Sequence, residues 1–157
     1  MTSRRRCLVP KIDLDAVPQE NRTGYPPPYD EAVQGRWVRR LAAPAGLSEM
    51  GASHVVLRPG AWTSQRHWHA LEDELLVVLA GEAVLVEDGG ETVLRAGDIA
   101  VWPKGVTNAH HLQNRSNADC SLIAISAGDA ANDHGDYPDI DLRFAPEGYL
   151  HKDGTPY

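Results

Sequence analysis

The sequence predicts an all-β protein of one domain, and three features of the chain lead to that prediction. Roughly nine short apolar runs, rich in valine, isoleucine and leucine, follow one another at a spacing of about 8–12 residues. Almost no stretch has the periodicity of an amphipathic helix. A length of 157 residues is that of one domain with a core of its own. We therefore expect a β-sandwich or a closed β-barrel.

Residues 1–35 are expected to form an irregular N-terminal arm. Proline disrupts helices and central strands, and the arm contains five prolines, at positions 10, 18, 26, 27 and 28. The Tyr-Pro-Pro-Pro-Tyr segment at residues 25–29 favours a polyproline II conformation. We expect this segment to pack across the outside of the domain with both tyrosines against the body.

Residues 36–127 carry the apolar runs and are predicted to form the barrel. Turn sequences such as Pro59-Gly60 and Asp88-Gly89-Gly90 separate the runs. Residues 128–157 become polar and proline-marked again, and we expect them to form a C-terminal extension packed on the barrel. The strands are expected, in chain order, at residues 37–41, 54–58, 62–69, 74–79, 82–87, 91–95, 99–102, 110–114 and 121–126.

Composition and charge exclude several classes of function. The formal net charge of -7 and the pI near 5.4 argue against a nucleic-acid-binding surface, which needs clustered Lys and Arg. No apolar run approaches the roughly 20 residues of a membrane span. The two cysteines, Cys7 and Cys120, make neither a disulfide framework nor a Cys-x-x-Cys metal pair. We therefore expect a cytoplasmic protein whose partners include neither nucleic acid nor a membrane.

A cluster of histidines and acidic residues in the middle of the chain has the pattern of a metal site. His67 and His69 are two residues apart, so on a strand both side chains leave the same face. Glu74 opens the next predicted strand and can lie opposite them if the two strands pair antiparallel. A further ligand is expected from His110 or His111, whose side chains would point to opposite faces of a strand.

The order of these residues resembles the first motif of the cupin superfamily. That motif consists of a glycine, a spacer, His-x-His, three or four residues, a glutamate, six residues and a glycine. The corresponding positions in this chain are Gly60, His67, His69, Glu74 and Gly81. Gly60 stands one residue further from the first histidine than in the usual pattern.

The second cupin motif is present with a departure. It consists of a glycine, five residues, Pro-x-Gly, two residues, a histidine, three residues and an asparagine, and it begins here with Gly97 and Pro103-Lys104-Gly105. The position of the histidine then holds Asn108, and the spacing of histidine and asparagine returns two residues late, at His110 and Asn114. This departure leaves the choice among His110, His111 and Asn108 open. The two motifs cover roughly residues 48–127.

The resemblance implies a single-domain cupin jelly-roll β-barrel with irregular N- and C-terminal extensions. It places His67, His69, Glu74 and His110 on the inner wall, where they would bind one divalent transition metal ion. Three imidazoles and one carboxylate suit Zn, Mn, Fe, Ni or Co, whereas magnesium and calcium prefer oxygen ligands.

Three neighbouring polar residues are candidates for supporting the metal site or the substrate. Strand alternation places Thr63 and Gln65 on the face of His67 and His69, where they can bond to ligands or substrate. Asn114 would share a face with His110, although it could equally be an ordinary residue at a strand end.

The extensions together with the motifs are similar to those of small bacterial cupins that are described as sugar-phosphate isomerases or left without a known function. We expect an enzyme that acts on a small oxygen-rich substrate, such as a sugar, a sugar phosphate or a hydroxy or keto acid. The reaction would be a metal-assisted isomerisation, epimerisation or elimination. The alternatives are an iron- or manganese-dependent dioxygenase and a non-catalytic ligand-binding or sensor protein, because one fold hosts many chemistries.

Two further expectations concern the substrate and the partner. Scattered arginines such as Arg58 and Arg95 are the only phosphate-binding candidates near the motifs, which weakens the sugar-phosphate alternative. Barrels of this type often pair through edge strands, and the N-terminal arm is placed to reach a neighbour, so we expect a homodimer.

Overall fold

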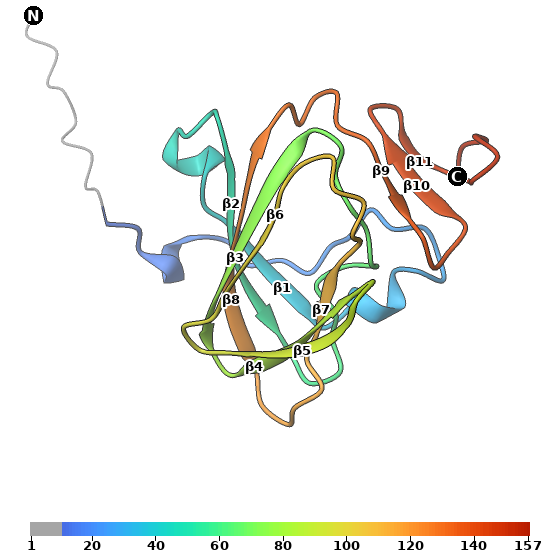
Figure 1. The fold of residues 1–157 in the computed structure, drawn as a ribbon. Helices are drawn as coiled ribbons and strands as arrows, with labels where there is room; N and C mark the ends of the chain where they lie inside the picture. Colours follow the sequence, from blue (N-terminus) through green and yellow to red (C-terminus); the bar gives the residue numbers. More distant parts are fainter. Residues whose placement is uncertain (1–10) are drawn as a thin grey trace, which may run out of the picture.

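The computed structural model describes residues 11–157, and these residues form an almost purely β structure (Figure 1). Three single-turn 3-10 helices, Leu14–Ala16, Glu31–Val33 and Ala43–Ala45, are the only helical segments in that part of the chain. None of its helices has the length and apolarity needed to cross a membrane. The all-β fold class is therefore confirmed. Residues 1–10, the beginning of the predicted arm, lie outside the described residues.

Residues 11–157 contain eleven strands. Eight of them coincide with predicted strands to within a few residues. The strands are β1 (Arg36–Arg40), β2 (Gly51–Leu57), β3 (Glu72–Ala80), β4 (Glu82–Glu87), β5 (Gly90–Arg95), β6 (Ile99–Trp102), β7 (His111–Gln113), β8 (Cys120–Gly128), β9 (Gly135–Tyr137), β10 (Leu142–Ala145) and β11 (Gly148–Leu150).

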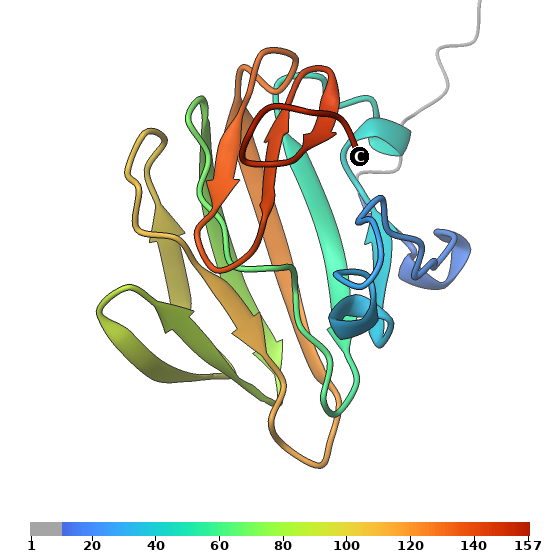
Figure 2. The ribbon, with the colours of Figure 1, turned by 90° about the vertical axis from the view of Figure 1, so that its right-hand side faces the viewer.

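The strands form two facing layers and a small third sheet (Figure 2). One layer has the order β1-β2-β8-β3-β6, and the other has the order β5-β4-β7. Every pair is antiparallel, and the hydrogen bonds do not join the two layers into a closed barrel. The jelly roll is thus a sandwich that stays open along its edges.

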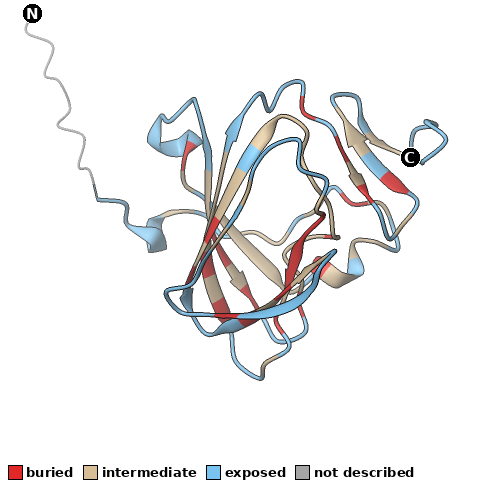
Figure 3. Ribbon diagram, in the orientation of Figure 1, coloured by how far each residue is buried: buried red, intermediate tan, exposed pale blue. Residues whose placement is uncertain are grey.

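The core lies between the two layers, where the inward-facing residues of both sheets meet (Figure 3). Leu57, Leu76 and Leu122 of the larger sheet pack with Leu85 and Leu112 of the smaller one, and each of these side chains is buried. Burial of a leucine side chain contributes about 1.5–3 kcal/mol. Leu76, Leu112 and Leu122 also line the cavity that contains the polar residues described below.

The predicted strand at residues 62–69 is wrong, because this segment is a bent loop with two isolated bridges. Trp62 pairs with Gln113, and His67 pairs with His110. Between these bridges the backbone N–H of Gln65 bonds to the Tyr25 hydroxyl instead of to a neighbouring strand. Contacts with the N-terminal arm thus replace the ladder that the sequence pattern predicts.

The N-terminal arm crosses the outside of the domain, but not as polyproline II helix. Residues 27–30 form a turn, and the Pro27–Pro28 peptide bond is cis. Tyr25 is buried against Tyr137 and Tyr149, with ring centroids 5.7 Å and 5.3 Å away. The tyrosines of this segment therefore pack against the body as expected, although the backbone conformation differs.

The C-terminal residues form a third sheet, in the order β11-β10-β9, that the sequence analysis did not predict. In Figure 1 the blue N-terminal arm begins on the left and crosses to the right, where the third sheet lies in red. A second cluster of buried residues, Tyr25, Val33, Tyr137 and Leu142, holds the two terminal segments together. Arg66 adds a bidentate ion pair, with both contacts to Asp139 at 2.8 Å.

Gly81 joins β3 to β4 in a turn that packs closely against the β7–β8 loop. Its φ of +77° is in the left-handed region, and a Cβ there would lie 2.5 Å from the Asp119 carbonyl oxygen. We expect Gly81→Ala to lower the free energy of unfolding by about 2–5 kcal/mol, from backbone strain plus the clash. The measurement is urea unfolding followed by circular dichroism.

Gly60→Ala is the matched control for this prediction. Gly60 has a similar φ of +84°, and nothing lies within 4 Å of its Cβ position. Backbone strain alone should cost about 1–2 kcal/mol there. Equal losses in the two variants would contradict the role assigned to the close approach of Gly81 and the β7–β8 loop.

Candidate metal centre

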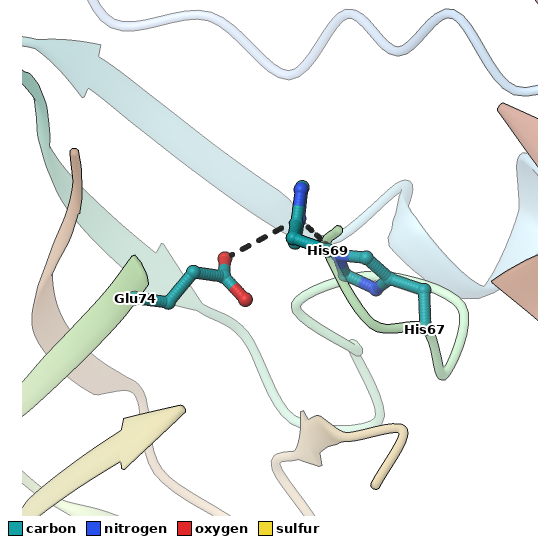
Figure 4. A group of neighbouring side chains, drawn as sticks. All are labelled: His67, His69 and Glu74. Carbon is teal, nitrogen blue, oxygen red and sulfur yellow. Dashed lines mark hydrogen bonds and ion pairs between the residues drawn. The ribbon is translucent and has the colours of Figure 1, made fainter. Parts of the chain in front are cut away.

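Four side chains from three separate parts of the chain converge at the polar end of the interior. His67 Nε2 lies 3.0 Å from His69 Nε2, and His69 Nε2 lies 3.6 Å from Glu74 Oε1. The other carboxylate oxygen of Glu74 lies 2.8 Å from His110 Nε2. Figure 4 shows His67 and His69 facing Glu74 across a small gap. The structure thus brings together the residues singled out by the sequence pattern.

Backbone pairing places three of these side chains. The bridge between His67 and His110 consists of two N–H···O bonds, of 3.2 Å and 2.9 Å, which align the two residues side by side. Glu74 lies near the start of β3, where it pairs with Ser126 of β8 and Trp102 of β6. The side chain of Glu74 therefore leaves the inner face of the larger sheet toward the histidines.

The Nδ1 atoms of His67 and His69 are held by acceptors that face away from the gap. His67 Nδ1 lies 2.8 Å from the carbonyl oxygen of Gln65. His69 Nδ1 lies 2.5 Å from a carboxylate oxygen of Asp133, whose other oxygen accepts the backbone N–H of Leu71 at 2.7 Å. A donor bond from Nδ1 leaves Nε2 with its lone pair, which is the form of imidazole that binds a metal ion.

Aromatic rings enclose the histidines. Trp102 stacks on His110 with centroids 3.8 Å apart and an angle of 6° between the rings. Tyr137 stacks on His67 at 5.3 Å, and Phe144 lies 5.0 Å from His69. The rings limit the rotation of the imidazoles and keep bulk water from surrounding them.

Burial and neighbouring charges determine the protonation of the site. Burial lowers the pKa of His67 to about 4, against the opposing effect of the Glu74 carboxylate. Burial alone would raise the pKa of Glu74, but the close contact with His110 and the nearby His69 and His67 lower it to about 2. At neutral pH the site therefore presents a neutral His67 imidazole and an ionised carboxylate, as metal ligands must be.

These residues fit a divalent transition metal ion. Glu74 Oε2 is buried and lies 2.8 Å from His110 Nε2. Such a close approach is compatible with two ligands of one ion, because ligands about 2.0–2.2 Å from a metal lie about 3 Å from each other. The ligating atoms of His67, His69 and Glu74 all lie within 4.8 Å of one another. Imidazole and carboxylate donors suit Zn, Mn, Fe, Ni or Co.

The centre faces a cavity of about 540 Å³. Its lining includes the four side chains of the centre, together with Thr63 and residues of β1, β2, β10 and β11. Volumes of about 300–1,000 Å³ are typical of sites for small molecules. The described chain thus places its candidate ligands at the wall of a cavity large enough for a small metabolite.

The comparisons with known proteins agree with this arrangement. The family model of the cupin domain matches residues 53–126. A crystal structure from Silicibacter pomeroyi, named a sugar phosphate isomerase from a cupin superfamily, is 35% identical, with a TM-score of 0.88, and the match covers 94% of this chain and 96% of that chain. The chain belongs to the cupin superfamily. No curated protein matches this cupin.

Two more distant structures share the fold alone. The polyketide cyclase RemF from Streptomyces resistomycificus is 19% identical, with a TM-score of 0.61 over 74% of this chain and 78% of that chain. A protein from Acidithiobacillus ferrooxidans that carries sugar phosphate isomerase as a provisional name is 22% identical, with a TM-score of 0.65 over 74% of this chain and 76% of that chain.

The three residues left open by the second motif lie in different places in this cupin. His110 faces Glu74, whereas His111 points to the other side of β7, where its Nδ1 lies 2.9 Å from the Ser64 carbonyl oxygen. The side chain of Asn108 bonds to Glu87 at 3.1 Å. Only His110 of these residues lies beside the centre, as strand alternation requires.

The three supporting residues predicted from the sequence have other contacts. Thr63 lines the cavity, but its hydroxyl accepts the backbone N–H of Leu112 at 2.9 Å. The side-chain amide of Gln65 donates to the backbone carbonyl oxygen of Tyr29. Only the backbone carbonyl oxygen of Gln65 contacts His67. The side chain of Gln65 therefore does not point to the centre as expected, because the bend at residues 62–69 turns it toward the N-terminal arm.

Asn114 is a structural residue at the end of β7. It is fully buried, and its amide donates to the carbonyl oxygens of Leu57 and Ala118, each at 2.8 Å. Its own oxygen accepts the N–H of Ser116. These contacts are those of an ordinary asparagine at a strand end, and none of them is with His110.

Sequence reasoning missed the residues that the C-terminal extension brings to the centre. Asp133 and Tyr137 contact His69 and His67, and Phe144 packs beside them. Arg36 and Arg40 of β1 line the cavity, whereas the sequence analysis named only scattered arginines such as Arg58 and Arg95. The segment around Asp133 is polar and without periodicity, so no signal in a single sequence points to it. The alternation in β1 does place Arg36, Val38 and Arg40 on one face.

Proposed function

We propose that this cupin is a metal-dependent isomerase that acts on a small oxygen-rich substrate, with His67, His69, Glu74 and His110 as the metal ligands. The convergence of these four side chains at the wall of a metabolite-sized cavity carries the proposal. The name of the Silicibacter pomeroyi protein, a sugar phosphate isomerase, supports it.

The residues around the site have defined parts in such a reaction. A bound divalent ion would polarise a carbonyl or hydroxyl group of the substrate. Asp133 and the Gln65 carbonyl oxygen hold the imidazoles in one tautomer and orientation. Tyr137, Phe144 and Trp102 exclude water from the reacting atoms. An aldose–ketose interconversion needs a proton moved between neighbouring carbons and no external oxidant.

The test is a substrate screen with defined metals. The protein is loaded in turn with Zn, Mn, Fe, Co and Ni and incubated in D₂O with aldoses, ketoses, their phosphates and hydroxy acids. Proton NMR is expected to show conversion of one class, together with deuterium at the carbon next to the carbonyl group. Glu74→Gln is the control variant and should lose this exchange.

The same screen distinguishes the alternative chemistries. Oxygen uptake that requires Fe(II) or Mn(II) would indicate that the protein is a dioxygenase and not an isomerase. Saturable ligand binding without turnover or exchange under any metal would indicate a binding protein. Either result would contradict the proposed isomerase, the first through oxygen consumption and the second through ligand binding without turnover.

The homodimer and the cytoplasmic location expected from the sequence stay predictions. The outer face of edge strand β6 offers one place for a second copy, because Ile99 and Val101 are 63% and 60% exposed. Light scattering at micromolar concentration measures the oligomeric state directly.

A further inference from the structure

Arg36 holds a positive charge at the wall of the cavity without a carboxylate partner. It is half-buried at the start of β1 and lines the cavity that contains the metal centre. Its only side-chain hydrogen bond among residues 11–157 runs from a terminal nitrogen to the Thr63 carbonyl oxygen, at 2.6 Å. Its Nε is buried and has no partner there. Most of the five N–H donors of this guanidinium thus remain free.

Some arginines of the domain are paired with carboxylates. Arg66 lies between Asp88 and Asp139, and Arg115 makes a bidentate pair with Glu91 at 2.7 Å and 2.8 Å. No carboxylate of residues 11–157 lies within 4.0 Å of Arg36, which therefore differs from both. Arg39, Arg58 and Arg143 also have no carboxylate within 4.0 Å among residues 11–157, but none of them lines the cavity. A charge removed from water is costly unless it finds an opposite charge. The usual reason to keep one in a cavity is a ligand that supplies that charge.

Three tyrosines share the cavity with this guanidinium. Tyr25, Tyr137 and Tyr149 line the same cavity. Burial raises the pKa of Tyr25 to about 12 and also raises the pKa of Tyr149, so both are neutral at physiological pH. Burial lowers the pKa of Arg36, but not enough to discharge a guanidinium. Neutral hydroxyl groups therefore share the cavity with Arg36. Arg40, the other arginine that lines it, is exposed and lies 3.6 Å from a carboxylate oxygen of Glu20.

Tyr137 connects this region to the metal centre. Its ring packs against Tyr25 on one side and stacks on His67 on the other. Thr63, whose carbonyl oxygen Arg36 contacts, belongs to the same loop as His67. A single small molecule in the cavity can thus reach the guanidinium with one end and the histidines with the other.

We propose that Arg36 binds a terminal oxyanion of the ligand, a phosphate or a carboxylate group, while the hydroxyl or carbonyl oxygens of the same molecule face the metal centre. A planar guanidinium with free donors matches the oxygens of either group. The identification of this ligand as the substrate rests on the proposed function. Arg36 would then be a specificity residue that selects anionic sugars or acids over neutral sugars.

The test measures anion binding to the metal-free protein. Thermal unfolding midpoints are recorded against inorganic phosphate and, separately, acetate, with sodium chloride keeping the ionic strength constant. A ligand that binds only the folded state raises the midpoint in a saturable way. We expect such a rise for at least one anion, and the stronger of the two indicates whether a phosphate or a carboxylate is recognised.

Three variants show whether Arg36 is responsible. Arg36→Gln is expected to weaken anion binding by about tenfold or more. Arg36→Lys keeps the charge but loses the paired N–H donors of the guanidinium, so it should weaken anion binding by less. Arg95→Gln is the control, because Arg95 is exposed on β5 and pairs only loosely with Glu82, at 3.5 Å. Circular dichroism of each variant confirms that it is folded. Arg36→Lys keeps the test valid if Arg36→Gln does not fold.

Two results would overturn the inference: no saturable anion effect on the wild type, or the same effect in the Arg36 variants. Metal affinity is measured on the same proteins and should be unchanged by Arg36→Gln, because Arg36 is not among the proposed ligands. If no metal binds while anion binding still depends on Arg36, the proposed function fails and the anion site stands.

Discussion

Replacing His110 with alanine is expected to lower the affinity for Zn(II) by more than about 100-fold. Changing a residue that only supports a ligand costs about 10–100-fold, so losing a ligand should cost more. His110 Nε2 lies 2.8 Å from Glu74 Oε2, and the ring stacks on Trp102. The measurement is competition with a chromophoric chelator at pH 7.5.

His111→Ala is the matched control for this experiment. Both rings are buried, at 5% and 4% exposure, and both pack against a tryptophan. Destabilisation of the fold should therefore be similar in the two variants, whereas only His110→Ala should lose the metal. If His111→Ala lost the metal and His110→Ala kept it, the assignment of the second motif would be wrong.

Asp133→Asn is expected to weaken metal binding about 10–100-fold without unfolding the protein. The carboxylate of Asp133 binds the Nδ1 of His69 with one oxygen and the N–H of Leu71 with the other. An amide has a single acceptor oxygen, so one of these two bonds is lost. His69 is then free to turn or to change tautomer. Chelator competition gives the affinity, and near-ultraviolet circular dichroism checks the packing of the aromatic rings.

Asp139→Asn separates this effect from a general loosening of the C-terminal extension. Asp139 belongs to the same extension and holds it to the body through Arg66. That variant should lose stability but bind metal as the wild type does. Equal losses of affinity in both variants would mean that Asp133 acts only by fastening the extension.

The sequence predicts the strands of the two layers because each is a short apolar run bounded by turn residues. In the structure the side chains of these runs alternate between the two faces. Leu76 and Val78 face inward while Leu75 and Val77 face outward, and the same period of two continues in the neighbouring strands. The histidine and glutamate spacings likewise depend on local geometry. His67 and His69 point the same way across only two residues, and this holds although their segment is a bent loop.

Contacts between distant parts of the chain decide what the sequence does not predict. Residues 62–69 leave the sheet because the N-terminal arm takes the hydrogen bonds of Gln65. Asp133 reaches His69 only because the extension returns across the mouth of the sandwich. The alternation in β1 sets the face of Arg36, but its place in the cavity depends on which strands pair with β1 and on the tyrosines that cover it.

Anomalous X-ray diffraction from crystals grown with Zn(II), recorded on both sides of the zinc absorption edge, tests the central assignment most directly. The predicted result is one strong peak per chain within about 2.3 Å of a nitrogen of His67, His69 and His110 and an oxygen of Glu74. A neighbouring group offers a competing position, because His69, Glu72 and Asp133 also cluster. A peak among those three residues, or none near the histidines, would contradict the assignment.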